Sequence, residues 1–395
     1  RHQIKKNIGE AISKLTINDQ RLTINDSEIE VTRSSDPKFG DYTTNVALRF
    51  AQGKPSDGRK TKQSPLEFAR VLTDSLKDLP YVSKLEVAGP GFINFFIKPE
   101  IWQKEISDVL TSDKKYGASQ IGKGKKARVE FVSANPTGPL HFGNARGGPI
   151  GDSLANVLEF TGWHVIREYY HNDVGGQVDK LGQSILNIMK GQKLEDQEYK
   201  GEYLLDLARE IRGMKFWKKS VEYPELTAAL VGSTSVRILL KQILSDTRAM
   251  GIIFDQEPYS ESRFIDKGIT KEVIDKLSKK GFLKEKDDAL WFAPSDEFLK
   301  DRETVVVKSD GNYTYFANDI AYHNLKFESN PDLVVDVFGA NHHGHVPRLQ
   351  AVIKALGYDV SRFQVILYQW VRFKRGGELI KMSKRSGTFV TAREV

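Results

Sequence analysis

The sequence has no cysteine among its 395 residues. This absence excludes a disulfide scaffold, thiol-based catalysis and any zinc site with thiolate ligands. No run approaches the ~18 consecutive apolar residues that a membrane-spanning helix needs, and no signal-peptide pattern opens the chain. Repeats and low-complexity segments are also absent. With 39% hydrophobic and 28% charged residues, the chain is expected to be a soluble, cytoplasmic protein with packed cores.

The charge balance is basic, with a formal net charge of +7 and a pI near 9.1. An excess of Lys and Arg favours a polyanionic partner, because neutralised phosphates release counterions. The 59 basic and 52 acidic residues are interspersed rather than gathered in blocks, so many of them must form solvated faces. The composition is therefore compatible with nucleic-acid binding but does not establish it.

The first 110 residues predict a small α+β domain. Two alternating runs, 82–87 and 92–97, flank Gly89-Pro90-Gly91 and predict a β-hairpin. Further elements are expected as a strand at 28–32, helices at 42–51 and 65–76, and a helix after Pro99. Residues 111–126 are rich in Lys, Gly and Ser and predict a linker.

Residues 127–395 predict an α/β domain with a Rossmann-like parallel sheet. The expected strands are 127–133, 163–170, 332–338 and 363–373, with helices at 141–160, from about 174, and at 345–356. A largely helical insertion at about 190–250 interrupts the alternation. Because ligands of such sheets bind beyond the carboxyl ends of the strands, the functional residues are expected there.

The segment from Glu130 to Asn144 combines the end of a strand, a Pro- and Gly-rich loop and the start of a helix. Unpaired N–H groups at a helix start attract phosphate, and His141 and Asn144 lie one helical turn apart. Gly143 allows a nucleotide to approach the backbone. The alternative is a glycine-rich turn with a capping histidine, and the string alone does not exclude it.

A second segment, 381–387, reads Lys-Met-Ser-Lys-Arg-Ser-Gly and follows the glycine pair Gly376-Gly377. Ammonium groups on a Gly/Ser loop suit the charge that develops on a leaving pyrophosphate. The alternative for an isolated basic heptapeptide is a surface loop. Two phosphate-binding elements in this order, separated by an α/β crossover region, are much less expected by chance than either one alone.

The two segments resemble the HIGH and KMSKS signatures of class I aminoacyl-tRNA synthetases, and the extended pattern resembles arginyl-tRNA synthetases in particular. Similar strings span nearly the whole chain and are least clear in the helical insertion. They are Val129-Glu130-Phe131, Asn135-Pro136, Asn172-Asp173-Val174-Gly175, 316–323, 339–349 and 375–387, with 39–47 and 89–96 resembling that family's appended tRNA-binding domain.

The chain departs from the family pattern at two places. Asn144 stands where the first signature has its last histidine, and an amide can still donate a hydrogen bond to ATP. Many members lack the second lysine of the second signature and carry one in the loop before the first. Here that loop has Gly138 and Lys384 is retained, so Lys384 is expected to stabilise the pyrophosphate charge.

The resemblance implies an arginine–tRNA ligase that activates L-arginine with ATP and transfers it to the 3′ end of tRNA(Arg). It implies catalytic roles for His141, Asn144, Lys381 and Lys384. The residues implied in ATP binding are Pro136, Thr137, Gly138, His141, Gly143, Asn144, Met382, Ser383 and Lys384.

For the substrate guanidinium, the resemblance implies the carboxylates of Glu130 and Asp319 and the hydroxyl of Tyr315. Two carboxylates can satisfy the planar donors of a permanently charged guanidinium. The alternative for Asp319 is a helix N-cap, because Asn318-Asp319 precedes an apolar run. Contacts to the amino and carboxylate groups of arginine are implied for Ser133, Asn135 and His343.

No metal site is expected, although His342, His343 and His345 are close in sequence. Adjacent residues of an extended segment point to opposite sides, and no acidic or thiol partner has ligand spacing. Magnesium is expected with ATP as part of the substrate, and no tightly bound cofactor is implied.

The N-terminal domain is expected to bind tRNA through Phe92 and Asn94, by stacking and by amide hydrogen bonds. The alternative for Phe92 is the core of the hairpin. Rival functions are a small-molecule adenylyltransferase and a non-catalytic synthetase-like RNA-binding paralogue. A monomer is expected, without the helical anticodon-binding domain that follows this region in the family.

Overall fold

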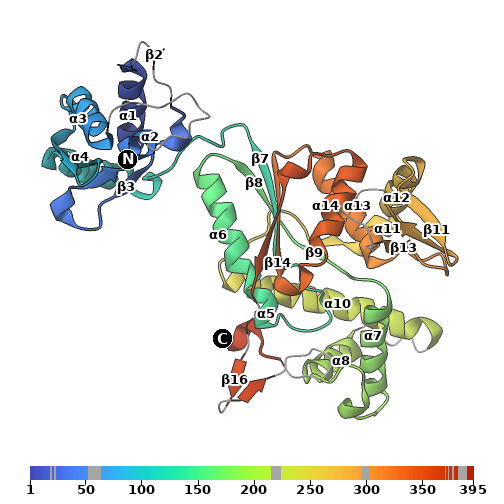
Figure 1. Ribbon diagram of the computed structural model, residues 1–395. Helices are drawn as coiled ribbons and strands as arrows, with labels where there is room; N and C mark the ends of the chain where they lie inside the picture. The colour runs from blue at the N-terminus through green and yellow to red at the C-terminus, as the bar shows by residue number, and fades with distance from the viewer. Residues whose placement is uncertain are drawn as a thin grey trace. The chain divides into compact units, whose positions relative to one another are not determined.

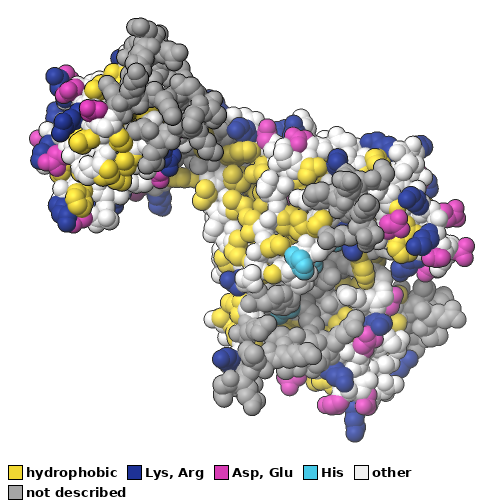
Figure 2. Space-filling view, viewed as in Figure 1, with side chains coloured by type: hydrophobic (Ala, Val, Ile, Leu, Met, Phe, Trp, Pro, Cys, Tyr) yellow, Lys and Arg dark blue, Asp and Glu magenta, His cyan; other side chains and the backbone are white. Residues whose placement is uncertain are grey.

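The computed structural model describes two compact units, Arg1–Gly117 and Ala118–Val395, each with its own core. The described residues are 1–17, 20–21, 24–51, 64–214, 224–294, 303–369, 371, 373–375, 378–380 and 389–395. No helix of these residues is long and apolar enough to cross a membrane. On the face drawn in Figure 2, basic and acidic side chains alternate over the surface instead of forming one patch.

The N-terminal unit is an antiparallel sheet packed against helices. The sheet has the order β3-β4-β6-β5. Its buried side includes Ile93 and Phe95, which pack on the apolar sides of the helices. The elements are α1 (His2–Lys14), β3 (Val31–Arg33), β4 (Tyr42–Thr44), α2 (Val46–Ala51), α3 (Pro65–Leu76), β5 (Val82–Ala88), β6 (Phe92–Ile97) and α4 (Pro99–Ser112), with short strands β1 (Thr16–Ile17) and β2 (Gln20–Arg21).

Local signals account for most of this unit. The hairpin and the helix that begins at Pro65 are confirmed, and Ser64 and Glu67 form a capping box at the start of that helix. The predicted helix at 42–51 was wrong in its first part. Tyr42–Thr44 forms a strand paired with β6, because aromatic and β-branched residues favour a sheet once a partner strand is present.

The expected linker is shorter in the structure. Helix α4 extends to Ser112, a 3₁₀ turn (Asp113–Lys115) follows, and the boundary between units falls after Gly117. The next strand already begins at Lys126.

The second unit is built on a parallel sheet with the order β15-β14-β7-β8, which confirms the predicted fold class. Its strands are β7 (Lys126–Glu130), β8 (His164–Glu168), β14 (Leu333–Gly339) and β15 (Phe363–Tyr368). The chain passes from β7 to β8 on one side and from β14 to β15 on the other. The strand order therefore reverses between β7 and β14, where such folds bind ligands.

Both faces of this sheet are covered by helices (Figure 1). Helix α6 (Gly147–Phe160) packs with Val335 and Val337, and helices α13 (Tyr315–Glu328) and α14 (Val346–Leu356) pack with Val334. Gly151 allows the approach of α6, because a Cβ there would lie 2.3 Å from the Phe131 ring.

The helix predicted at 141–160 is divided into α5 (Phe142–Ala145) and α6. Pro149 lacks the N–H that would continue the helical ladder to Ala145, which accounts for the break.

Two inserted regions separate β9 (Tyr170–His171) from β14. The helical one was predicted at 190–250 but begins earlier, with α7 (Gly176–Met189), α8 (Tyr203–Gly213) and α10 (Pro224–Ala249). The second was not predicted. It contains β10 (Tyr259–Ser260), α11 (Glu261–Asp266), α12 (Ile269–Lys279) and an antiparallel sheet of β11 (Leu283–Lys286), β12 (Ala289–Phe292) and β13 (Thr304–Val307).

The predicted strand at 363–373 is two strands in the structure. β15 ends at Tyr368, and β16 (Phe373–Arg375) pairs with β17 (Glu378–Ile380) in a separate hairpin.

Candidate functional site: an acidic pocket at the sheet switch point

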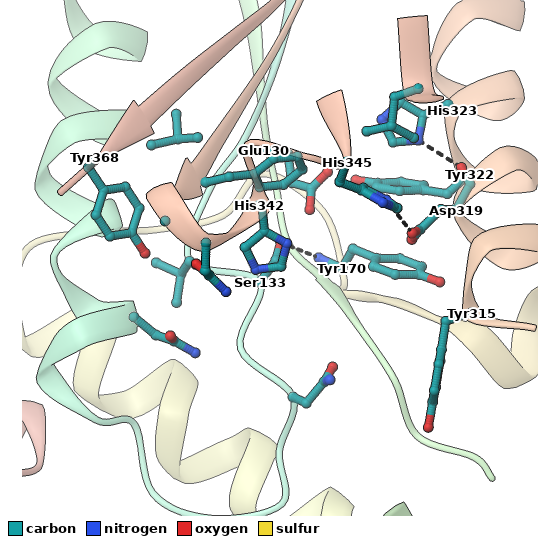
Figure 3. Close-up of a pocket in the computed structure, with 18 of the residues that line it drawn as sticks. Glu130, Ser133, Tyr170, Tyr315, Asp319, Tyr322, His323, His342, His345 and Tyr368 are labelled. Atoms are coloured by element: carbon teal, nitrogen blue, oxygen red, sulfur yellow. Dashed lines mark hydrogen bonds and ion pairs between the residues drawn. The ribbon is translucent and has the colours of Figure 1, made fainter. Parts of the chain in front are cut away.

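A pocket opens beyond the carboxyl ends of β7 and β14 in the second unit (Figure 3). Its described lining includes the carboxylates of Glu130, Glu261 and Asp319 but no lysine or arginine. The lining also includes the phenol side chains of Tyr170, Tyr315, Tyr322 and Tyr368 and histidines 323, 342 and 345. This part of the pocket is therefore suited to a cation with hydrogen-bond donors.

The loop after β7 adopts an unusual backbone conformation. Val132 and Ser133 have φ of 67° and 38°, in the left-handed region that β-branched residues rarely enter. The Ser133 N–H donates to the carbonyl of Phe131 at 2.9 Å, and the Ser133 hydroxyl accepts from the Tyr170 N–H at 3.1 Å. Strained residues that their surroundings hold in place are characteristic of functional sites.

The same loop fixes Asn135. Its side-chain oxygen accepts from the backbone N–H of Asn172 at 3.0 Å, which ties the loop after β7 to the segment after β9. Asn172 in turn accepts from the N–H of Val174 at 2.9 Å. Ser133 and Asn135 thus line the pocket on a loop that hydrogen bonds hold in place.

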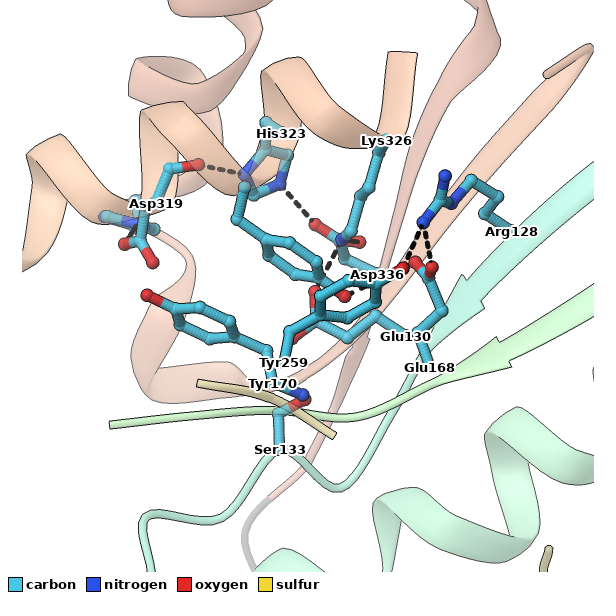
Figure 4. Close-up of polar contacts among 12 residues, drawn as sticks. Arg128, Glu130, Ser133, Glu168, Tyr170, Tyr259, Asp319, His323, Lys326 and Asp336 are labelled. Carbon is cyan, nitrogen blue, oxygen red and sulfur yellow. Dashed lines mark hydrogen bonds and ion pairs between the residues drawn. The ribbon is translucent and has the colours of Figure 1, made fainter. Parts of the chain in front are cut away.

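Beneath the pocket lies a buried network of paired charges, which we call the floor (Figure 4). The ammonium of Lys326 lies 2.5 Å from Glu130 Oε2 and 2.6 Å from Asp336 Oδ1, and the ring of His323 lies 2.8 Å from Asp336 Oδ2. Burial alone would raise the pKa of Asp336, but Lys326 and His323 lower it to about 2. Burial raises the pKa of Glu130, and Lys326 opposes this effect.

A second buried pair supports the floor. Arg128 donates to Glu168, and the Tyr322 hydroxyl donates to the other oxygen of Glu168 at 3.3 Å. Tyr322 also stacks on Tyr170, with ring centroids 4.6 Å apart. These contacts hold the aromatic surface of the pocket against the sheet.

The side of the pocket formed by Glu261, Tyr315 and Asp319, which we call the wall, has a different charge balance. Asp319 Oδ2 is hydrogen-bonded to His345 Nε2 at 2.9 Å. Glu261 accepts from the Tyr170 hydroxyl at 3.1 Å and from the Asn318 amide at 3.3 Å. Burial, followed by the charge of Asp319, raises the pKa of Glu261 to about 8.

Tyr315 is the exposed member of the wall, with a relative accessibility of 49%. Partial burial raises the pKa of its phenol, the negative charge of Glu261 adds to this, and the amide of Asn172 opposes it. Its hydroxyl therefore remains a neutral hydrogen-bonding group near the pocket opening.

Comparisons with known proteins match this architecture. The family model described as tRNA synthetases class I (R), catalytic domain, matches residues 105–395, and the arginyl tRNA synthetase N terminal domain model matches residues 2–97. The chain belongs to the arginyl-tRNA synthetase family.

Individual relatives agree with this family. An arginine–tRNA ligase of Citrifermentans bemidjiense is 42% identical over 378 residues, covering 93% of the chain and 66% of the relative. One from Desulforamulus reducens is 39% identical, covering 98% and 68%. The chain thus spans about two thirds of the length of these relatives.

Solved structures share the fold. The arginyl-tRNA synthetase of Thermus thermophilus has a TM-score of 0.66 at 19% identity, covering 93% of the chain and 65% of that structure. That of Plasmodium falciparum has a TM-score of 0.65 at 18% identity, covering 93% and 64%.

Five of the residues that the family pattern implies for arginine lie together in the pocket. They are Glu130, Ser133, Asn135, Tyr315 and Asp319. Asp319 is not the cap of its helix, because Thr314 caps α13 with its side chain and Asp319 lies more than one turn further on.

His343, which the family pattern implies as a contact of arginine, does not line the pocket. Residues 340–342 form a 3₁₀ turn that leaves His343 exposed and outside the described lining, whereas His342 and His345 line the pocket. A histidine cluster alone could not indicate which ring faces inward. Among the described residues, no group of three or more His, Asp or Glu side chains could hold a metal ion.

The residues expected to bind ATP are only partly placed in the pocket. Gly143 and Asn144 line it. His141 caps α5, accepting from the Asn144 N–H at 3.2 Å through Nδ1, so the capping alternative describes one of its contacts. Pro136, Thr137 and Gly138 are outside the lining, and the Thr137 carbonyl accepts from the Tyr203 hydroxyl at 2.9 Å.

Four further predictions lie outside the described residues. They concern Lys381, Met382, Ser383 and Lys384, in the segment 381–388.

In the N-terminal unit, the two residues expected to contact tRNA differ in exposure. Phe92 is 37% exposed at the start of β6, and Asn94 is 3% exposed within the sheet, opposite Thr43 and Glu86. The exposure of Phe92 argues against the hairpin-core alternative for this residue. Asn94 is not part of the core cluster that contains Ile93 and Phe95, and its contact with tRNA stays a prediction.

Sequence reasoning missed Glu261, Tyr170 and the floor residue Lys326, and it named His345 only as a member of the histidine cluster. Glu261 begins a six-residue helix in the unpredicted insertion, and no motif marked it. Lys326 could have been suspected, because it stands on the largely buried helix α13 among apolar residues, where an unpaired cation is costly.

Proposed function

We propose that the chain catalyses the ligation of L-arginine to tRNA(Arg), using ATP. The observation that carries this proposal is a pocket with three carboxylates and no described lysine or arginine, next to the helix start that holds Gly143 and Asn144. Arginine supplies the permanent cation and planar donors that such carboxylates accept. In this proposal Gly143 lets the nucleotide approach the backbone, and the side-chain amide of Asn144 donates a hydrogen bond to it.

In the first step, an oxygen of the arginine carboxylate attacks the α-phosphorus of ATP. The bond between the α-phosphorus and the bridging oxygen breaks, and magnesium pyrophosphate leaves. In this proposal Glu130, Tyr315 and Asp319 hold the guanidinium, and Ser133 and Asn135 orient the amino and carboxylate groups. Catalysis comes from positioning and charge stabilisation, with Lys381 and Lys384 as the cations for pyrophosphate.

In the second step, a hydroxyl of the terminal tRNA ribose attacks the carbonyl carbon of the adenylate and displaces AMP. The N-terminal unit binds the tRNA elsewhere, with Phe92 stacking on an unpaired base. The chain is proposed to act as a cytoplasmic monomer.

The test is ATP–pyrophosphate exchange with arginine, lysine and citrulline, each with and without tRNA(Arg). Exchange is expected with arginine and tRNA, is expected to be faint without tRNA, and should be absent with the other two amino acids. The ammonium group of lysine cannot bind the carboxylates through a planar set of donors. The side chain of citrulline is planar but carries no charge. Comparable exchange with lysine or citrulline would overturn the proposal.

A further inference from the structure

We propose that Tyr203, in the helical insertion, is a positioning residue for the nucleotide side of the site. It acts through two segments: the loop 136–138, which precedes His141, and the segment 389–392, which pairs with the chain around His141. The inference rests on the proposed function and adds to it a residue from outside the signature motifs.

Tyr203 contacts both segments directly. It is the first residue of helix α8, and its hydroxyl donates to the carbonyl of Thr137 at 2.9 Å. Its ring packs against the ring of Phe389, with centroids 6.3 Å apart and an angle of 64° between the planes. Burial raises the pKa of the Tyr203 phenol, so the hydroxyl remains a hydrogen-bond donor at neutral pH. Tyr203 thus links two segments that are far apart in the sequence.

The segment that Phe389 begins is paired with the chain on both sides of His141. Segment 390–392 forms two backbone hydrogen bonds with segment 140–142, of 2.9 and 2.7 Å, and Thr391 is opposite His141 in an antiparallel bridge. In Figure 1 the C-terminal end of the chain accordingly lies beside α5. Because paired backbones keep a fixed relative position, a displacement of Phe389 would also move the chain around His141.

The helical insertion is a suitable support because it has a core of its own. Leu204 of α8 is fully buried in a cluster with residues of α7 and α10. The insertion makes a second contact with the C-terminal segment, since Arg393 Nε donates to Asp246 Oδ1 on α10 at 3.0 Å. Tyr203 and Arg393 therefore fix the position of segment 389–393 at both of its ends.

The arginine side of the site has separate supports. The Ser133 hydroxyl accepts from the N–H of Tyr170, and the side chain of Asn135 accepts from the N–H of Asn172. Both donors precede the helical insertion in the chain and lie on β9 and the loop after it. Loss of the contacts of Tyr203 should therefore affect ATP more than arginine. This difference separates a positioning role from a merely stabilising one.

The first experiment compares Tyr203→Phe with the unmodified chain. The variant keeps the ring and lacks the hydroxyl that donates to Thr137. A hydrogen bond of this kind contributes about threefold to tenfold to an equilibrium constant. We therefore expect kcat/KM for ATP, in ATP–pyrophosphate exchange with arginine and tRNA(Arg), to fall by about that factor. The Kd of arginine, measured by calorimetry, should stay the same.

Tyr358→Phe is the matched control. It removes a hydroxyl that donates to Asn324 Oδ1 at 3.0 Å elsewhere in the same unit. Both variants should lower the midpoint of denaturant unfolding by a similar small amount, whereas only Tyr203→Phe should lower kcat/KM for ATP. Equal kcat/KM values for ATP in the two variants would overturn the inference.

A second variant tests the ring contact. Phe389→Leu leaves the hydroxyl of Tyr203 in place and removes the packing of the two rings, and it should also lower kcat/KM for ATP about threefold to tenfold. If Tyr203→Phe does not fold, this variant decides. Equal losses for ATP and for arginine in either variant would show that Tyr203 only stabilises the unit, and the inference would be wrong.

The proposed function can fail without the inference. If the unmodified chain binds ATP but shows no exchange with arginine, the proposed function is wrong. Calorimetric titration of Tyr203→Phe and Tyr358→Phe with ATP then tests the inference alone. Binding that is about threefold to tenfold weaker in Tyr203→Phe supports it, and equal binding overturns it.

Discussion

The floor and the wall of the pocket place carboxylates side by side under opposite charge balances. On the floor, Asp336 is matched by Lys326 and His323, and its pKa falls to about 2. On the wall, Glu261 has only neutral donors, and its pKa rises to about 8. Both carboxylates are buried, so the presence or absence of a neighbouring cation decides whether the pKa is lowered or raised.

This difference separates stabilising charges from ligand-binding ones. A buried carboxylate with its cation in the chain contributes to the fold, and removal of either partner leaves an uncompensated charge. A buried carboxylate without a cation in the chain weakens the fold, and its negative charge can pair with a cationic ligand. Substitutions on the floor should therefore affect stability first, and substitutions on the wall should affect arginine binding first.

The largest expected effect is on the floor. Lys326→Met leaves Glu130 and Asp336 buried without their cation and should reduce the free energy of unfolding by about 3–5 kcal/mol. Denaturant unfolding measures this. Lys271→Met removes an exposed lysine paired with Asp275 and should leave the unfolding midpoint unchanged. Equal midpoints for both variants would show that the floor is not an ion-pair network.

The next effect is on the wall. Asp319→Asn removes one charge that is proposed to bind the substrate guanidinium, and it should weaken arginine binding by about 2–5 kcal/mol, or tenfold to several thousandfold. ATP binding should be unchanged. Stability should be equal or higher, because the repulsion between Asp319 and Glu261 is relieved. If calorimetry shows that the variant binds arginine normally, Asp319 has a structural role and does not bind the substrate.

The pH dependence of stability should distinguish the two regions without ligand. The pKa of Glu261 is raised from 4.5 to about 8, so its contribution is fully present below pH 4.5 and is lost as pH rises toward 8. The pKa of Asp336 is lowered from 3.8 to about 2, so its contribution is present above pH 3.8 and is lost as pH falls through 2. Glu261→Gln should remove an alkaline loss of about 2–4 kcal/mol.

The measurement is denaturant unfolding at intervals from pH 5 to 9, for the unmodified chain and Glu261→Gln. Relative to the variant, the unmodified chain should lose stability steadily from pH 5 to 8, and the two curves should become parallel near pH 9. Parallel curves over the whole range would contradict the raised pKa.

The smallest expected effect lies in the loop that connects the floor to the pocket. Val132→Gly removes a buried side chain but relieves a φ of 67°, so the losses and gains should nearly cancel, within about 1 kcal/mol. Val129→Gly, at a buried strand position, has no strain to relieve and should cost about 3 kcal/mol. Arginine activation should fall in Val132→Gly, because the loop that orients Ser133 is loosened. If denaturant unfolding shows the same loss of stability for both glycine variants, the loop is not strained.

Local sequence patterns predicted the elements that depend on near neighbours. Pro65 and the capping residues fix the start of α3, and Gly89-Pro90-Gly91 fixes the hairpin. Local patterns failed where a strand distant in sequence determines the secondary structure. Tyr42–Thr44 is such a case, because it pairs with β6 about fifty residues later in the chain. Tertiary pairing overrides intrinsic propensity at such positions.

By itself the sequence determined the parallel α/β class, the strand–turn–helix segment around His141, the family, and seven of the residues that meet in the pocket. Only the tertiary structure decided which carboxylates have a cation. Lys326 reaches Glu130 across 196 residues, and Asn318 reaches Glu261 across 57. Periodicity and motifs record local spacing, whereas the ionisation of a buried carboxylate depends on the charges that folding brings within a few ångströms of it.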